Sequence, residues 1–571
     1  MHRMMIDNKI HKKSVIIGAL IVLSLVFLFV LPLGHDLRFH IWRIGTMASE
    51  LQKNPGQLPI RMLSDSYNGY GYGAALYYGD LFLYIPALLV CVGVDEVWAY
   101  KIFIILILWG TFGIAYYSAR IMKKEKEIAL FFSTFYTFSS YSLQNLYVRS
   151  AIGEALAFMF LPLVIAAFCN ILYEDKRMWN WFLLGGAMSA IAMSHILTLV
   201  LVTIVLIIWC ILEIKKVIVE KKVIEIFKAA GFMIGISASF LFPMFEQMLH
   251  QKVQVNGNSD YERQRFLAHT IDSIDYFIPY EMKKIWASLY TNEWNVEVWH
   301  PGAVGLFVFI IVGAVLALKP KLNKKQIGIV VCSMGGLIVL SIYRVTNMLR
   351  EFFIFIQYPW RLLMLITLGF SFSGIMVLNN VECGEKRRRN VEWCMLIGTL
   401  LIAIWSIGPR IYTYIQESNV SSYEKDMIIY DKNAGDDLYL PTGVARDFYM
   451  ERGETIVASN KGIEFEWQRT QNGINIHIIE NLFENGSLEL PLYMYKGYAA
   501  MTTDGEYLPI VKSENGLVSV EIGNSIGDIK VWYQGTLVQK ISDLITLITI
   551  ISLLCGYRII IYKLRRKKET I

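Results

Sequence analysis

Long apolar runs constrain the fold of this chain more than any other feature of its sequence. Runs of about 18 or more mostly apolar residues are long enough to cross the hydrocarbon core of a bilayer as helices. With 55% of its 571 residues hydrophobic and 18% charged, the chain is expected to be an all-α polytopic membrane protein. By the spanning-length rule there are about twelve runs, at residues 14–33, 98–119, 128–146, 154–173, 179–195, 196–213, 224–245, 302–318, 326–343, 355–378, 391–408 and 541–562.

Basic residues at alternate junctions predict the orientation of these runs. If each run reverses direction, all the basic clusters fall on one side, which the positive-inside rule makes cytoplasmic. The alternation requires that residues 81–94, a short stretch containing Pro86, do not span. The first run lacks the pattern of a cleaved signal peptide, so it is expected to be a retained anchor, with both termini in the cytoplasm. The clusters lie at residues 120–126, 176–177, 215–222, 319–325, 386–389 and 565–568.

The same alternation predicts the domain organisation. Residues 1–408 form a transmembrane domain with external segments 34–97 and 246–301. Residues 409–540 then switch to period-two alternation, with the turn dipeptide Asn472-Gly473 between IEFEWQRT and INIHII, a hairpin signal. We expect a small β-sandwich-like domain outside the cell there, followed by a last membrane helix and basic tail at 541–571. The net charge of +6 is accounted for by the membrane junctions, which argues against a nucleic-acid partner.

The stretch LPLGHDLRFHIWRIGTMASEL directly after the first run carries a group of polar residues. If residues 36–52 are helical, Asp36, His40 and Arg43 share one face, while Leu37, Ile41 and their successors form an apolar face. One interpretation makes Asp36 a general base at the membrane boundary, with a cation nearby to keep it ionised. The alternative is that Asp36 caps the helix and that His40 and Arg43 face water.

Three further groups of candidate residues fall at external helix ends. In YVRSAIGEALAF, Arg149 and Glu154 offer a phosphate ligand and a second acid, or else a simple ion pair. His195 in AMSHILT is a candidate substrate contact or a hydrogen-bonded structural histidine. In QYPWRLL, Trp360 and Arg361 form either an interfacial anchor or a phosphate site. All these residues could converge with Asp36 and His40 on one outward cavity.

The glycine-rich stretch SYNGYGYGAALYYGD, residues 66–80, follows no strand and has the wrong spacing for a pyrophosphate loop. Its glycines and aromatic residues instead suggest a close-packed loop that lets a sugar or lipid approach the backbone.

The order of several motifs resembles one bacterial membrane family. These motifs are GHDLRFHIWRI, NGYGYG, VRSAIGEALAFMFLPL, SHILT and YPWRLL. Together they resemble the polytopic proteins of the 6-pyruvoyl-tetrahydropterin-synthase-related membrane domain, which are similar to teichoic-acid-glycosylating membrane proteins and to GT-C glycosyltransferases. The resemblance covers the chain to about residue 408. The pterin name carries no chemistry here, since the chain has no comparable histidine cluster.

The resemblance implies an enzyme of the bacterial cell membrane that moves a sugar from a polyprenyl-phosphate donor to an envelope polymer or glycolipid on the extracytoplasmic face. It implies catalytic roles for Asp36 and Glu154 and substrate binding by His40, Arg43, Arg149, His195 and Arg361. Many relatives carry a pair of acids where His35-Asp36 stands, so whether a divalent metal takes part is left open, and no other cofactor is implied. The alternatives are a transporter or flippase of lipid-linked precursors and a non-catalytic scaffold for envelope assembly.

Overall fold

The chain divides into two compact units. The computed structural model describes residues 2–29, 34, 36–174, 179–254, 277–278, 303–342, 348, 356–418, 437–444, 451–470 and 473–569. The first unit comprises Met1–His40, Val97–Ala229 and Ser259–Asp426, and the second comprises Ile41–Glu96, Ala230–Asn258 and Met427–Ile571. This division differs from the predicted boundary at residue 408, because two segments from the first half of the chain pack with the C-terminal region.

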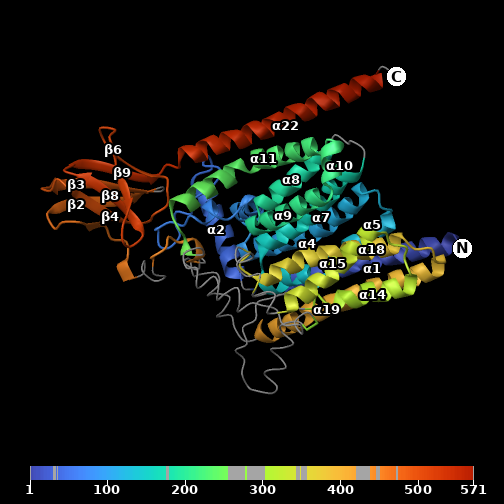
Figure 1. The fold of residues 1–571 in the computed structure, drawn as a ribbon. Helices are drawn as coiled ribbons and strands as arrows, with labels where there is room; N and C mark the ends of the chain where they lie inside the picture. Colours follow the sequence, from blue (N-terminus) through green and yellow to red (C-terminus); the bar gives the residue numbers. More distant parts are fainter. Residues whose placement is uncertain are drawn as a thin grey trace. The chain divides into compact units, whose positions relative to one another are not determined.

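The first unit is a set of helices that run alongside one another (Figure 1). Two helices, α2 (Leu37–Lys53) and α11 (Lys222–His250), contribute to both units. The others are α1 (His2–Phe29), α4 (Glu96–Ile121), α5 (Lys126–Thr137), α6 (Ser140–Gln144), the π-helical turn η3 (Asn145–Arg149), α7 (Ile152–Tyr173), α8 (Asn180–Ala192), α9 (Ile196–Leu212), α10 (Ile214–Val219), α14 (Leu306–Leu318), α15 (Lys324–Ser341), η7 (Pro359–Leu362), α18 (Leu363–Asn379) and α19 (Glu385–Ser418).

Membrane-spanning helices are the main feature of the chain. Within the described ranges, seven helices are long and apolar enough to cross a bilayer. They are Lys12–Phe29, Glu96–Ile121, Ile152–Tyr173, Lys222–His250, Pro359–Asn379, Glu385–Tyr412 and Leu537–Cys555. The chain is therefore a multi-pass membrane protein, whereas the figure of about twelve spans stays a prediction.

Four of the five remaining expected runs are shorter or broken. The run 128–146 is divided among α5, α6 and η3, and α8 has 13 residues, which at 1.5 Å per residue is only about 20 Å long. The stretch 81–94 forms a 3-10 turn and a helix of 8 residues, which agrees with the expectation that it does not span.

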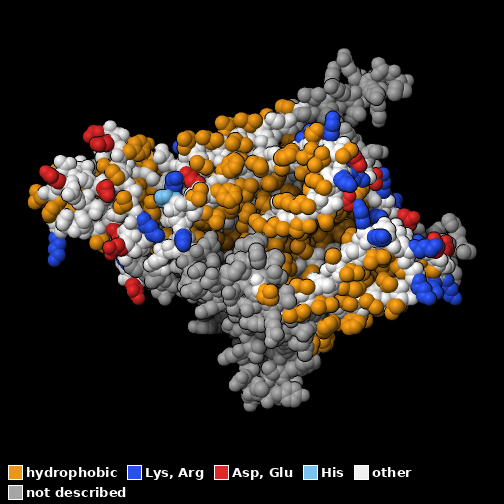
Figure 2. All heavy atoms as spheres, viewed as in Figure 1, with side chains coloured by type: hydrophobic (Ala, Val, Ile, Leu, Met, Phe, Trp, Pro, Cys, Tyr) orange, Lys and Arg blue, Asp and Glu red, His pale blue; other side chains and the backbone are white. Residues whose placement is uncertain are grey.

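Lysine side chains from three separate turns lie at one end of the first unit. Lys123 after α4 pairs with Glu174 at the end of α7, and Lys222 Nζ donates to the Glu174 carbonyl at 3.2 Å. Lys325 at the start of α15 pairs with Glu213 at the end of α9. We call this the basic end. Figure 2 shows lysine and arginine side chains gathered there, around α10, with hydrophobic side chains along the helix flanks.

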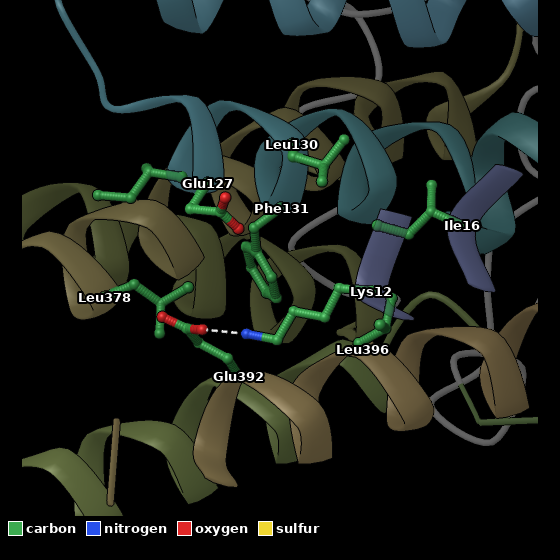
Figure 3. A pocket seen from close by; sticks show the side chains of 9 residues that line it. Lys12, Ile16, Glu127, Leu130, Phe131, Leu378, Glu392 and Leu396 are labelled. Carbon is green, nitrogen blue, oxygen red and sulfur yellow. Dashed lines mark hydrogen bonds and ion pairs between the residues drawn. The ribbon is translucent and has the colours of Figure 1, made fainter. Parts of the chain in front are cut away.

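A small cavity lies beside the N-terminal helix α1, between helices of the first unit (Figure 3). Lys12 of α1 pairs there with Glu392 of α19, and Glu127 of α5 lines the same space of about 20 Å³. That volume is about one water molecule in size. Because Glu127 follows the turn that carries Lys123, this cavity also lies at the basic end.

The second unit combines a β-sandwich with short helices and a long C-terminal helix. Its helical elements are η1 (Ala74–Leu76), η2 (Leu81–Leu83), α3 (Tyr84–Cys91), η8 (Asp437–Tyr439) and α22 (Leu537–Glu569). Its strands are β1 (Val457–Ala458), β2 (Ile463–Thr470), β3 (Gly473–Asn481), β4 (Gly486–Tyr493), β5 (Tyr498–Thr502), β6 (Tyr507–Leu508), β7 (Ile510–Lys512), β8 (Leu517–Gly523) and β9 (Gly527–Tyr533).

The strands form two antiparallel sheets, in the orders β1-β4-β8-β7 and β2-β3-β9-β5-β6. Alternate residues of both sheets share one core, in which Ile476, Leu490 and Val520 are almost completely buried. The predicted β-sandwich is therefore confirmed. The expected hairpin is the β2–β3 pair, with Thr470 opposite Gly473. The turn residue Asn472 lies outside the described residues, as do the junction 176–177 and most of the external segment 246–301.

Candidate functional site

The predicted site residues Glu154, His195 and Arg361 lie at the helix ends opposite the basic end. Glu154 begins α7, whose other end, 20 positions on, carries Glu174; at 1.5 Å per residue the two are roughly 30 Å apart. His195 is likewise 18 positions before Glu213 along α9. Arg361 precedes α18, and Lys321 N–H bonds the Asn380 carbonyl just beyond that helix at 2.9 Å. This separation follows from helix direction alone.

The segment before α2 is fixed to the end of η3 by its backbone. The Asp36 N–H donates to the Arg149 carbonyl at 3.0 Å, and the Asp36 carbonyl accepts from the His40 N–H at 3.1 Å. The Asp36 side chain is partly buried and lies within electrostatic reach of Arg149, Glu154 and Arg361. Its carboxylate accepts no hydrogen bond from any described residue, so burial, which outweighs the two guanidinium groups, raises the pKa of Asp36.

The turn that carries Arg149 has an unusual backbone. Residues Asn145–Arg149 form a π-helical turn, which ends at Ser150 with φ +57°. A left-handed residue other than glycine costs about 1–3 kcal/mol and persists only where its surroundings hold it. Here the Ala151 N–H donates to the Asn145 carbonyl at 3.0 Å, which turns the chain into α7 and aims Arg149 back at Glu154.

Glu154 is the centre of a buried cluster of polar side chains. Its exposed fraction is 2%, and Arg149 donates to both carboxylate oxygens, at 2.9 and 3.3 Å. The Tyr141 hydroxyl donates to Oε1, and Asn145 Nδ2 donates at 3.4 Å. Arg361 Nε donates to Oε2 at 3.4 Å. A carboxylate with this many donors is held as an anion and holds both guanidinium groups in turn.

Arg361 belongs to the cluster although it lies 207 positions after Glu154 in the sequence. Its Nη1 donates to the Ile356 carbonyl at 2.7 Å and to Gln357 Oε1 at 2.9 Å. Trp360 beside it is 1% exposed, and the Arg149 guanidinium carbon lies 4.0 Å from its ring centroid, a cation–π contact. The idea that Trp360 and Arg361 form an exposed interfacial anchor is therefore wrong, because the protein itself covers both side chains.

His195 has a defined local role. Its Nδ1 accepts from the Thr198 N–H at 3.3 Å and lies 2.7 Å from the Thr198 hydroxyl, so the residue caps the N-terminus of α9. This is the structural role weighed as the alternative. In the neutral ring the proton then sits on Nε2, and the ring lies within electrostatic reach of Glu154 and Arg361.

The helix predicted over residues 36–52 is present as α2, but its polar face is not solvated. His40, Arg43 and Glu50 are 2%, 1% and 6% exposed, so the alternative that His40 and Arg43 face water is wrong. Arg43 belongs to the second unit, where it pairs with Asp80. The structure thus brings together Asp36, Arg149, Glu154 and Arg361, and it places Arg43 in a separate ion pair.

Two residues of the cluster, Tyr141 and Asn145, are not predicted from the sequence. Asn145 precedes Arg149 by four positions, and its Oδ1 accepts from Arg149 Nη1 at 2.5 Å. The spacing of four is the only signal for Asn145 that the sequence offers. For Tyr141 the sequence gives none, because a tyrosine in an apolar run predicts only core packing.

The glycine-rich loop does not leave its backbone open to a sugar or lipid. The Gly69 carbonyl accepts from Arg469 Nη1 at 2.6 Å, and the Tyr70 carbonyl accepts from the Tyr493 N–H at 2.8 Å. A Cβ on Gly73 would lie 2.8 Å from the ring of Tyr495. The close approach predicted from the glycines is real, but its partner is the β-sandwich, so the ligand interpretation is wrong.

Substitution of Gly34 by alanine is expected to dislodge the segment that carries Asp36. A Cβ there would lie 2.7 Å from the Ser150 Cβ and 2.8 Å from the Arg149 carbonyl carbon, and overpacking of this kind costs about 1–3 kcal/mol. Thermal unfolding in detergent measures the loss. Gly18→Ala is the matched control, since nothing lies within 4 Å of that position; equal melting temperatures of the two variants would contradict the docking.

Among the described residues, no group of three or more His, Cys, Asp or Glu side chains lies close enough to hold a metal ion. The cluster instead consists of two acids and two guanidinium groups, a charge-balanced set suited to binding an oxyanion through arginine.

Comparison with known proteins yields little. No family model and no curated protein matches the sequence. Among solved structures, the chain is similar to the arabinofuranosyltransferase AftD from Mycobacteria, with 12% sequence identity and a TM-score of 0.39. The similar region covers 70% of this chain but only 27% of that one, so the chain spans about a quarter of the length of the protein it matches.

Proposed function

We propose that this protein is an integral-membrane glycosyltransferase of the GT-C type, which moves a sugar from a polyprenyl-phosphate donor to an envelope acceptor outside the cell. The observation that carries the proposal is the arrangement of Asp36 beside Arg149 and Arg361, with Glu154 holding both guanidinium groups. The family resemblance of the motifs that contain these residues supports the same interpretation.

Asp36 is the group suited to be the general base. Its carboxylate accepts no hydrogen bond from a described residue and is only partly buried, so it can receive a proton from an acceptor hydroxyl. Removal of that proton by a positioned base contributes about 10²–10⁴ in rate. Glu154, committed to five donor contacts, acts instead as a positioning residue for the two arginines.

Arginine is suited to the phosphate of the donor. Arg361 uses Nε and Nη1 for contacts within the protein, while its Nη2 makes no hydrogen bond to any described residue and is not fully buried. A guanidinium stays charged and presents paired donors to phosphate oxygens. Arg149 adds positive charge next to it, and His40 on α2 and the Nε2 of His195 are the further candidate substrate contacts.

The proposed reaction is a direct displacement at the anomeric carbon of the sugar. The acceptor oxygen loses its proton to Asp36 and forms the new glycosidic bond, while the bond from the anomeric carbon to the phosphate oxygen breaks. The polyprenyl phosphate leaves with that electron pair, and its charge is stabilised by the arginines. Attack opposite the leaving group inverts the anomeric configuration.

The proposed membrane orientation rests on the distribution of charge. The basic end faces the cytoplasm under the positive-inside rule, so the cluster at the opposite helix ends faces outward, where the lipid-linked donor and the envelope acceptor meet. The β-sandwich is proposed to present the acceptor.

The test is transfer by the full-length protein in proteoliposomes. Radiolabelled polyprenyl-phosphate pentoses and hexoses would be supplied with an envelope glycan fraction, and labelled glycan would be separated from lipid. We expect one donor to give an alkali-stable glycosidic product of inverted configuration. A transporter would instead move the lipid-linked label across the bilayer without a new glycosidic bond, and that outcome would reject the enzymatic proposal.

A further inference from the structure

A polar cavity at the basic end is not used by the proposed reaction. It has a volume of about 190 Å³ and is lined by the end of α7, the start of α8 and the start of α11. A water molecule occupies about 30 Å³ of liquid, so the cavity can take several waters or a compact headgroup. Its lining residues belong to the first unit.

The cavity offers more positive than negative groups to a ligand. Lys221, Lys222 and Lys228 line it with two acids. One acid, Glu174, is paired with Lys123 from outside the cavity, and the other, Glu225, is paired with Lys228 at 2.8 Å. These pairs neutralise both carboxylates.

Two of the remaining lining groups are available as donors. Lys221 is exposed, with φ +54°, and makes no ion pair with any described residue. Asn180 is 5% exposed, yet its side-chain amide makes no hydrogen bond within the part of the chain that the structure describes. Its amide atoms are not fully buried, so they are open to the cavity that Asn180 lines.

The surroundings of the cavity are apolar and exposed. Ile218 and Val219 on α10 are 61% and 78% exposed, and Ile224 and Phe227 on α11 are 50% and 72% exposed. Exposed apolar side chains beside lysines at the end of a membrane helix mark the level of the lipid headgroups. A ligand here would therefore have acyl chains against these residues and its charge in the cavity.

We propose that this cavity binds the phosphodiester headgroup of an anionic phospholipid of the inner leaflet, with Lys221 and Asn180 as its donors. Basic pockets between membrane helices on the cytoplasmic side suit such headgroups, and the Asn180 amide can donate to a phosphate oxygen. The site is separate from the Asp36 cluster, which lies at the other end of the same helices, so failure of either proposal leaves the other standing.

The experiment measures lipid retention by the delipidated full-length protein in detergent. Phosphatidylglycerol or phosphatidylcholine is added, and bound lipid is counted by native mass spectrometry. We expect the anionic lipid to be retained preferentially. The double variant Asn180→Ala/Lys221→Gln should reduce its affinity about tenfold, since one charge-assisted hydrogen bond is worth about that factor.

The variant is chosen because neither side chain makes an ion pair or hydrogen bond to a described residue, so the fold should persist without lipid. The control Lys215→Gln/Lys324→Gln alters two residues that do not line the cavity, at the same end of the helices. Equal loss of affinity in both variants would assign binding to general membrane electrostatics and overturn the proposal.

A second arm distinguishes lipid from free phosphate. Phosphatidylglycerol should raise the melting temperature of the wild-type protein but not that of Asn180→Ala/Lys221→Gln. If inorganic phosphate alone raises the wild-type melting temperature as much as the lipid does, the cavity is a phosphate site and the lipid proposal fails.

Discussion

Glu154→Gln is expected to destabilise the protein by about 3–5 kcal/mol, because it removes the anion that compensates two buried cations. Arg149 and Arg361 both donate to this carboxylate and are 7% and 8% exposed. The glutamine can keep some of the hydrogen bonds but carries no charge. Thermal or denaturant-induced unfolding in detergent measures the loss.

The control for this prediction is Glu392→Gln, which removes a carboxylate that also pairs with two cations, Lys12 and Arg388, but lies where solvent reaches it. The side chain of Glu392 is 18% exposed and that of Lys12 is 14% exposed, and partly solvated pairs of this kind contribute about 1 kcal/mol or less. The two substitutions are chemically identical. If they cost the same, the central role of Glu154 is wrong.

A second variant separates charge compensation from shape. Glu154→Gln/Arg361→Gln removes one of the two cations along with the anion, so it should be less destabilised than the sum of the single variants. The coupling between positions 154 and 361 is expected to be about 0.5–3 kcal/mol. Strict additivity would show that Glu154 does not hold Arg361.

Sequence patterns predicted those parts of the fold that depend on local periodicity. Apolar runs gave the helices, and period-two alternation with a glycine turn gave β2 and β3, because both periodicities are properties of neighbouring residues. The break of the run 128–146 at η3 was not predicted, since Asn145–Arg149 contains no proline or glycine. Its π-helical backbone is held by contacts with residues distant in the sequence.

The candidate site was predictable only in outline. The expected topology grouped Asp36, Arg149 and Arg361 at the same helix ends, because basic clusters at the other ends predict the direction of each helix. The partner of each side chain depends on packing between segments that are far apart in the sequence. Arg361 and Glu154, for example, are 207 positions apart. The glycines after Asn68 show the same limit, since the sequence indicated a close approach but not that Arg469 and Tyr495 would be the partners.

Asp36→Asn is expected to lower the rate of sugar transfer by about 10²–10⁴, the contribution of a general base, while the protein stays folded. The wild-type rate should rise with pH as Asp36 ionises, because the base must be deprotonated. Burial raises the pKa of this carboxyl, so the acid limb of the rate profile should lie above the pKa of an ordinary aspartate. The limb should be absent from whatever activity the variant retains.

The stability of the same variant should change in the opposite sense. A carboxyl whose pKa is higher in the folded state contributes stability below its unfolded pKa, and that contribution is lost as the pH rises through its folded pKa. At neutral pH the Asp36 carboxylate is therefore a cost, so Asp36→Asn should melt at a higher temperature than the wild type, and the difference should vanish in acid. The control Asp65→Asn alters an exposed partner of Lys53 and should give no such gain. A structural aspartate would show the reverse, with stability lost on substitution at neutral pH, and that result would remove Asp36 from the proposed chemistry.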